Sequence, residues 1–166
     1  MNFVELYKND KLRISEMSKM ATSIVREHFD PLIGKAQNDY MLQMFQTEDA
    51  IYKQLENGYR YFFVKEDDRT VGFTAFYPRE GAMYLSKFYL YKSERRKGYA
   101  SKMLDFIVSE TKAAGLDGIE LNVNRGNDAC RVYEHMGFEI IREEKNDIGN
   151  GFFMDDYVYR LDVKER

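Results

Sequence analysis

A basic loop in the middle of the chain carries the residue types of an anion-binding site. Residues 95–97 are Arg-Arg-Lys, Gly98 follows, and the small Ala100 and Ser101 come soon after. A glycine lets a ligand approach the backbone because no Cβ stands in the way. A helix beginning here would present unpaired N–H groups and a partial positive charge. Together these features predict a site for a phosphate or pyrophosphate, although a solvated basic turn explains the loop alone equally well.

The segments on either side of this loop predict a strand before it and a helix after it. Met83–Tyr91 is rich in aromatic and aliphatic residues and indicates a strand. Beyond the loop, apolar residues recur at helical spacing up to Ala114-Gly115: Ala100, Met103, Leu104, Ile107 and Val108. Gly118–Asn124 then alternates apolar and polar residues, as a strand does. Strand, helix and strand at this length form a βαβ unit, so the two strands should run parallel with a right-handed crossover.

The rest of the chain divides into short elements of both kinds. Predicted helices occupy a segment capped by Asn9 or Asp10 and ended by Asp30-Pro31, then 36–46, then 47–57, and finally a short one from Asn127 or Asp128 to Met136. The other predicted strands are 3–7, 60–66, 70–77, 138–144 and 152–161, with a polar loop at 145–151. We therefore expect one α+β domain over residues 1–166, with a mostly antiparallel seven-stranded sheet, one parallel pair and helices on both faces.

The helix predicted over 36–46 is rich in aromatic residues and methionine. These residues are Tyr40, Met41, Met44 and Phe45. We expect them mainly in the core, with one wall of a substrate site as the alternative.

Composition indicates an ordinary globular protein. Of 166 residues 44% are hydrophobic and 32% are charged, the net charge is −3, and acids and bases are interspersed. This balance argues against a nucleic-acid-binding surface. No apolar run approaches the ~18 residues of a membrane helix, and residues 1–6 lack the pattern of a signal peptide. Cys130 is the single cysteine, so no internal disulfide can form, and the reducing cytoplasm is the expected location.

Two motifs resemble those of a known family. Arg95-Arg96-Lys97-Gly98-Tyr99-Ala100 is similar to the (Gln/Arg)-x-x-Gly-x-(Gly/Ala) loop of the GNAT superfamily of N-acetyltransferases. The block from Leu121 to Phe138 resembles the second hallmark, with Asn127, Tyr133 and Gly137 at matching places. Here six positions separate Asn127 from Tyr133 where many members have seven. The order of elements agrees as well, so the resemblance covers essentially the whole chain.

The resemblance implies acetyl-CoA as the co-substrate, and no metal. Its pyrophosphate would lie on the backbone N–H groups from Arg95 to Ser101 and its pantetheine arm along the strand edge at Phe88, Tyr89 and Leu90. That edge is free only if the two parallel strands splay apart beside the loop. One N–H of this strand segment would polarise the thioester carbonyl. Asn127 and Tyr133 would complete the cofactor site.

The implied reaction is direct attack by an amine in a ternary complex. Deprotonating an alkyl ammonium of pKa ~10.4 at pH 7 costs about 4 to 5 kcal/mol, so a base should assist. The candidate carboxylates are Asp155, Asp156, Glu139 and Glu80, each of which could equally be a surface or structural group. The resemblance assigns Tyr133 as the catalytic acid that protonates the departing thiolate, a role that suits a phenol of pKa near 10. Cys130 is expected to be a small packed side chain rather than a nucleophile.

Within the superfamily, three segments resemble bacterial spermidine/spermine N-acetyltransferases: Tyr40-Met41-Leu42, Asn57–Phe62 and Met154–Tyr157. The acceptor implied is therefore a small-molecule amine, foremost a polyamine. A protein N-terminus or lysine and an aminoglycoside are alternatives, and a domain that binds acyl-CoA without turnover is another. No nucleic-acid or membrane partner is expected, whereas a tyrosine-rich sheet would suit a homodimer.

Overall fold

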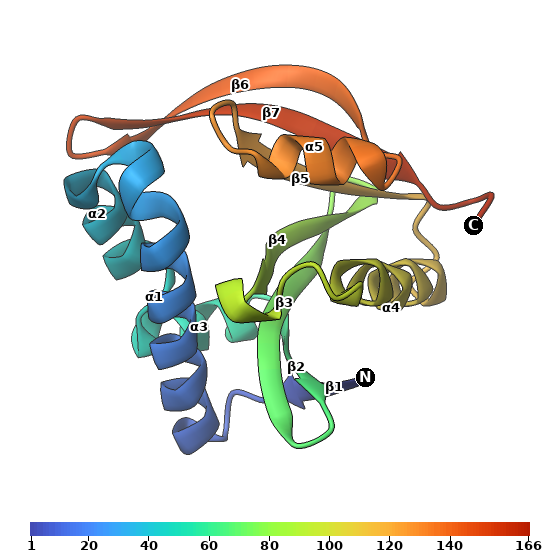
Figure 1. Cartoon of the computed structure of the whole chain (residues 1–166), viewed down its shortest axis with the longest axis horizontal. Helices are drawn as coiled ribbons and strands as arrows, with labels where there is room; N and C mark the ends of the chain where they lie inside the picture. Colours follow the sequence, from blue (N-terminus) through green and yellow to red (C-terminus); the bar gives the residue numbers. More distant parts are fainter. The chain divides into compact units, whose positions relative to one another are not determined.

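The computed structural model describes residues 1–166, except for the side chain of Phe29. Within these residues seven strands, five α-helices and one 3-10 helix follow one another in this order: β1 (Asn2–Leu6), α1 (Lys11–Ile33), α2 (Lys35–Phe45), α3 (Glu48–Glu56), β2 (Arg60–Glu66), β3 (Arg69–Arg79), β4 (Ala82–Leu90), η1 (Lys92–Glu94), α4 (Tyr99–Ala113), β5 (Gly118–Asn124), α5 (Ala129–His135), β6 (Glu139–Gly149) and β7 (Phe152–Asp162). Figure 1 labels these elements along the chain.

The strands form a mixed sheet in the order β1-β2-β3-β4-β5-β7-β6. The pairs β1–β2, β2–β3, β5–β7 and β6–β7 are antiparallel, and β4–β5 is parallel. The α+β class, the seven-stranded mixed sheet and the parallel pair predicted from the sequence are thereby confirmed. The parallel pairing joins Met83 with Ile119 and Tyr84 with Glu120.

Two compact units make up the chain. The first contains residues 1–77 and 87–102, and the second contains residues 78–86 and 103–166. Both β4 and α4 therefore contribute residues to each unit. Among the described residues, no helix combines the length and the apolar character that crossing a bilayer requires.

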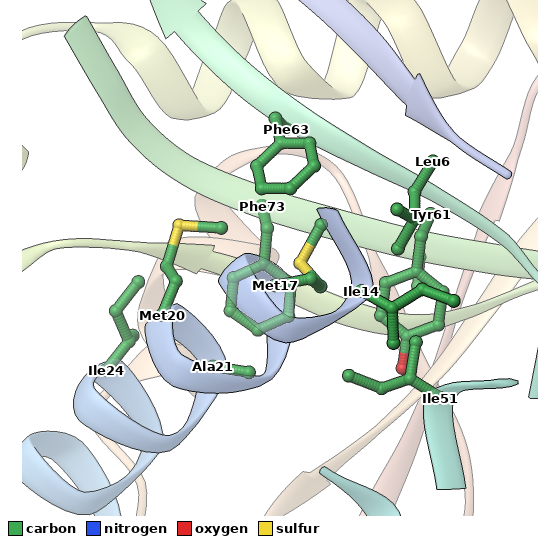
Figure 2. Packing of buried hydrophobic residues seen from close by; sticks show 11 residues of the cluster. Leu6, Ile14, Met17, Met20, Ala21, Ile24, Ile51, Tyr61, Phe63 and Phe73 are labelled. Atoms are coloured by element: carbon green, nitrogen blue, oxygen red, sulfur yellow. The ribbon is translucent and has the colours of Figure 1, made fainter. Parts of the chain in front are cut away.

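The core of the first unit lies between α1 and the strands β1–β3. Ile14, Met17, Ala21 and Ile24 repeat at helical spacing and are almost fully buried. Figure 2 shows Ile14 beside Tyr61 and Met17 beside Phe73, two aromatic residues of the sheet in the same cluster. The start of α1 is set by Asp10, which accepts a hydrogen bond from the backbone of the first helical turn.

The second unit is built on β5 and the long β6–β7 hairpin (Figure 1). In β5 the buried Ile119, Leu121 and Val123 alternate with partly exposed polar residues, as predicted. The hairpin turn consists of Asn150 and Gly151, both at positive φ (56° and 77°), which favours a tight connection. The predicted loop at 145–151 is thus wrong, because β6 continues to Gly149 and pairs with β7 almost to the turn.

Two further predictions about the first helices are wrong. The sequence predicted an end of α1 at Asp30-Pro31, yet α1 continues to Ile33 with Pro31 inside it. Pro31 removes one N–H from the helical ladder and crowds the carbonyl of the preceding turn, and the helix ends at Ile33, soon after it. In α2 the buried residues are Asn38 and Leu42, whereas Met44 is 41% exposed and does not belong to the core.

Candidate acyl-CoA site

The loop before α4 has the backbone shape of an anion-binding cradle. Arg96 and Gly98 both adopt positive φ, at 64° and 81°, on either side of Lys97. Alternation of left-handed and ordinary backbone turns successive N–H groups toward one concave side. Helix α4 begins at Tyr99, and its first turn contains no acidic residue. The positive end of its dipole therefore stays uncompensated within the described residues of that turn.

A buried carboxylate holds the loop in place. Glu94 is 7% exposed, and its Oε2 and Oε1 lie 2.9 Å from Arg69 Nε and 3.0 Å from Lys97 Nζ. Arg69 also donates to the Tyr99 hydroxyl at 3.2 Å, which links β3 to the start of α4. The hydrogen bonds from Arg69 and then Lys97 hold the pKa of Glu94 below its ordinary value. Lys97 therefore stabilises the loop through its ion pair with Glu94.

The end of β4 is positioned by its neighbour β3. The Tyr91 N–H donates to the Val71 carbonyl at 3.0 Å. A Cβ added to Gly72 would lie 2.1 Å from the Tyr89 carbonyl oxygen and 3.0 Å from the Leu90 Cα, so the two backbones approach more closely than any side chain would allow. Phe88, Tyr89 and Leu90 are partly buried.

Lys87 is a candidate functional residue that the sequence predictions missed. Its side chain is partly buried, and burial lowers the pKa of its amine to about 8. The Nζ lies 5.5 Å from the centre of the Phe45 ring on α2. A signal was present in the sequence, because Lys87 is the single charged residue in the otherwise apolar and hydroxyl-bearing strand 82–90.

In the second unit, Asn127 shapes the start of α5. Asn127 is 8% exposed, and its Oδ1 accepts a hydrogen bond from the Ala129 N–H at 2.9 Å. The Asn127 N–H in turn donates to the Asn124 carbonyl at 2.9 Å, which closes the turn after β5. Asn127 therefore has a local structural role, as a residue that begins the helix.

Tyr133 stands between two aromatic side chains of the same unit. Its ring centre lies 5.5 Å from that of Phe138, edge to face, and 6.3 Å from that of Tyr159. The Tyr159 hydroxyl donates to Glu134 Oε2 at 2.8 Å, which holds that ring in place. The Tyr133 side chain is partly exposed. These contacts fix the direction of a phenol that keeps access to solvent or substrate.

The four candidate carboxylates differ in their surroundings. Asp155 is 2.7 Å from Arg125 Nε in an exposed ion pair. Glu80 and Glu139 are exposed. Asp156, in contrast, is 2% exposed and accepts a hydrogen bond from Asn122 Nδ2 at 3.3 Å. Burial raises the pKa of the Asp156 carboxyl above its ordinary value.

Asp156 belongs to a small polar network on β5–β7. Asn122 Nδ2 also donates to Glu144 Oε2 at 3.2 Å, and the Tyr84 hydroxyl donates to Asn122 Oδ1 at 2.9 Å. Arg142 donates to the other oxygen of Glu144 at 2.8 Å. The amide of Asn122 therefore holds two carboxylates side by side.

The predicted site residues fall into the two units. The first unit brings together Phe88–Leu90 and Arg95–Ser101, which are consecutive parts of one strand, loop and helix. Asn127 and Tyr133 belong to the second unit. Within the described residues, no group of three or more His, Cys, Asp or Glu side chains is arranged to hold a metal ion.

Comparison with known families gives a match over most of the chain. The sequence model of the family described as "Acetyltransferase (GNAT) domain" matches residues 29–157. No curated protein matches the sequence at a significant level.

Many solved structures share the fold. One is the PaiA N-acetyltransferase from Thermoplasma acidophilum in complex with coenzyme A, at 14% identity and a TM-score of 0.73, over 98% of this chain and 99% of that one. An aminoglycoside 6'-acetyltransferase type Ii has 16% identity and a TM-score of 0.64, over 100% and 99% of the two chains. The ribosomal-protein-S18-alanine N-acetyltransferase from Escherichia coli has 16% identity and a TM-score of 0.66, over 98% and 93%. At these identities the likeness concerns the fold.

Proposed function

Because the chain belongs to the GNAT acetyltransferase family, we propose that it transfers the acetyl group of acetyl-CoA to a primary amine of a polyamine such as spermidine or spermine. The N-acetyltransferase class follows from the family. The acceptor and the roles of individual residues are the proposal. The observation that supports acetyl-CoA as the donor is the cradle at Arg96 and Gly98, whose two positive φ angles precede the uncompensated start of α4.

The cradle would hold the pyrophosphate of CoA through backbone N–H groups. A flexible phosphate chain gains most from donors that are already arranged, because no ordering cost is left to the binding step. Arg95 and Arg96 add an attraction that salt screens. In the solved relative from Thermoplasma acidophilum, the bound molecule is coenzyme A. The same ligand class suits the loop of this chain.

The reaction would proceed by direct attack. The amine nitrogen forms a bond to the thioester carbonyl carbon while an N–H from Phe88, Tyr89 or Leu90 stabilises the charge that develops on the oxygen. The carbon–sulfur bond breaks, and the Tyr133 phenol gives its proton to the thiolate. The amine loses a proton to a base in the same sequence of events. The products are an N-acetylated amine and CoA.

The polyamine acceptor is supported by the carboxylates of the second unit. Glu144 and the buried Asp156 share the amide of Asn122, and negative charge on this network would favour a substrate with several ammonium groups. The fold alone does not select an acceptor, because the related structures include enzymes named for an aminoglycoside and for a ribosomal-protein alanine.

A thiol-release assay with acetyl-CoA tests the proposal. Spermidine, spermine, an aminoglycoside, lysine and an N-terminal alanine peptide are offered in parallel. We expect fastest release with the polyamines. Faster release with another acceptor would overturn the polyamine assignment. Absence of release with every amine, together with CoA binding, would indicate a domain that binds acyl-CoA without turnover.

The role of Tyr133 has a separate test. Tyr133→Phe should lower kcat by about 10²-fold or more, the usual contribution of a general acid, with an unchanged CoA affinity by calorimetry. Tyr52→Phe is the matched control, because Tyr52 is 41% exposed on α3. A Tyr133→Phe enzyme with normal kcat would exclude the acid role.

A further inference from the structure

Lys87 lies next to the segment of β4 that is proposed to bind the thioester. It directly precedes Phe88–Leu90, whose N–H groups are the proposed donors to the thioester carbonyl, and neighbouring Cα atoms are about 3.8 Å apart. Thr74 Oγ1 donates to the Lys87 carbonyl at 2.7 Å, which holds the backbone at this residue. The side chain extends toward Phe45 at the end of α2.

The Lys87 amine lacks the partners that a structural lysine has. Within the described part of the chain its Nζ has no hydrogen bond and no ion pair, and its contact is the ring of Phe45. Leaving an unpaired ammonium in apolar surroundings is costly. A methionine or leucine would fill the same space without that cost, so the amine itself is the feature that needs a reason.

Among the described residues, no charged group offsets this cost. Burial alone lowers the pKa of Lys87. On β4 the titratable group of the same face is the phenol of Tyr89, and Tyr91 follows directly after the strand. The charged residues Lys35 and Asp39 of α2 are 2.7 Å apart and pair with each other, and β3 presents Thr74, which does not titrate.

We propose that Lys87 is the general base that takes the proton from the acceptor amine during acetyl transfer. In this step the nitrogen of the acceptor forms its bond to the carbonyl carbon and the carbon–sulfur bond breaks. The proton that leaves the acceptor nitrogen moves to the neutral Lys87 Nζ. Lys87 returns that proton to solvent after the product leaves. The inference rests on the proposed function.

The lowered pKa suits this role. At pH 8 a lysine of pKa about 8 is neutral in half of the molecules, whereas an ordinary lysine of pKa ~10.4 is neutral in about one in 250. A base whose pKa lies near the working pH combines a useful neutral fraction with sufficient basicity. As the pH rises through about 8, Lys87 loses its proton and the active form accumulates.

Two substitutions distinguish a Lys87 that accepts a proton from a Lys87 that acts only through its positive charge. Lys87→Met removes the amine at similar length, and Lys87→Arg retains a cation that does not deprotonate. In wild-type enzyme we expect kcat/KM for spermidine to rise with pH along a limb near pH 8. In both variants this rise of kcat/KM near pH 8 should be absent, and kcat should fall at least 10²-fold. Their affinity for CoA should stay within twofold of wild type. Lys53→Met, on the exposed surface of α3, should retain the wild-type profile.

A titration that does not depend on turnover accompanies the kinetics. Lysines methylated with ¹³C-formaldehyde give separate NMR signals, and the Lys87 signal is the one missing in Lys87→Met. It should titrate near pH 8 while exposed lysines titrate above 10.

Several results would overturn the inference. The first is a Lys87 NMR signal that titrates above pH 10. The second is a Lys87→Arg enzyme whose activity stays within threefold of wild type. The third is a rise of kcat/KM near pH 8 that persists in Lys87→Met and disappears in Asp156→Asn. If no amine is acetylated, the proposed function fails and the base role fails with it. A titration of Lys87 near pH 8 in that case would show that the error lies in the reaction assigned.

Discussion

Gly98→Ala should weaken CoA binding more than Arg96→Ala does, although it removes no charge. Gly98 has φ +81°, where an L-residue is strained, and nothing lies within 4 Å of a Cβ placed there. The substitution therefore adds backbone strain without a steric clash. Left-handed backbone costs an L-residue about 1–2 kcal/mol. If the loop relaxes in the free protein, binding must restore it, and Kd rises about 5- to 30-fold.

Arg96→Ala changes something different. Arg96 already holds φ +64° as a non-glycine residue, so alanine keeps the same backbone strain and removes only the charge. An exposed ion pair contributes about 0–1 kcal/mol, which corresponds to at most about a fivefold rise in Kd. This contribution should also vanish at high salt, since the screening length falls to about 3 Å at 1 M.

Calorimetric titration of CoA at 50 mM and at 1 M NaCl measures both effects. The Gly98→Ala loss should be similar at the two salt concentrations, and the Arg96→Ala loss should be confined to low salt. Gly58→Ala is the matched control, because Gly58 also has a positive φ, +93°, and open space around a Cβ, but it follows α3 and is not part of the loop. A larger loss in Arg96→Ala than in Gly98→Ala would refute the conclusion that the backbone does most of the binding.

Three further predictions concern the frame of the site. Gly72→Ala should destabilise the fold by about 1–3 kcal/mol and weaken CoA binding, because a Cβ there meets the Tyr89 carbonyl at 2.1 Å; an unchanged urea midpoint would contradict this. Met17→Ala should cost about 2–5 kcal/mol in urea denaturation, whereas Leu12→Ala, at a residue that is 80% exposed, should stay within about 0.5 kcal/mol. Asp156→Asn should raise Tm at pH 7, and this gain should disappear near pH 3. Burial raises the pKa of the Asp156 carboxyl in the folded protein, so the protonated carboxyl favours the folded state. The stability of the wild-type protein therefore falls as the pH rises through that raised pKa, whereas the amide does not titrate. A gain that persists at pH 3 would show that charge is not its origin.

Periodicity and turn residues were enough to predict most of the fold. The alternation in Gly118–Asn124 and the stripe from Ala100 to Val108 predicted a strand and a helix that the structure confirms. These patterns are local, because a strand and a helix each expose one face at a fixed repeat. The end of α1 at Pro31 was wrong because the local rule ignores how near the helix end a proline lies.

The loop at residues 95–101 also combines features that the sequence predicts with features that only the folded structure shows. The order of basic residues, Gly98 and the helix beyond it predicted an anion site from residue types alone. Only the structure shows that Lys97 pairs with Glu94, that Arg69 of β3 pairs with the same carboxylate, and that Arg96 shares the positive φ of Gly98. Charges that look equivalent along the chain are therefore not equivalent in the folded protein.

The sequence by itself determined the family, the order of elements and the loop and tyrosine that resemble its hallmarks, because these are carried by residue type and spacing. The tertiary structure decided the state of Lys87 and of Asp156. Each pKa depends on how completely neighbouring segments remove water from the side chain. Phe45 is distant from Lys87 along the chain, and only folding brings its ring to the amine.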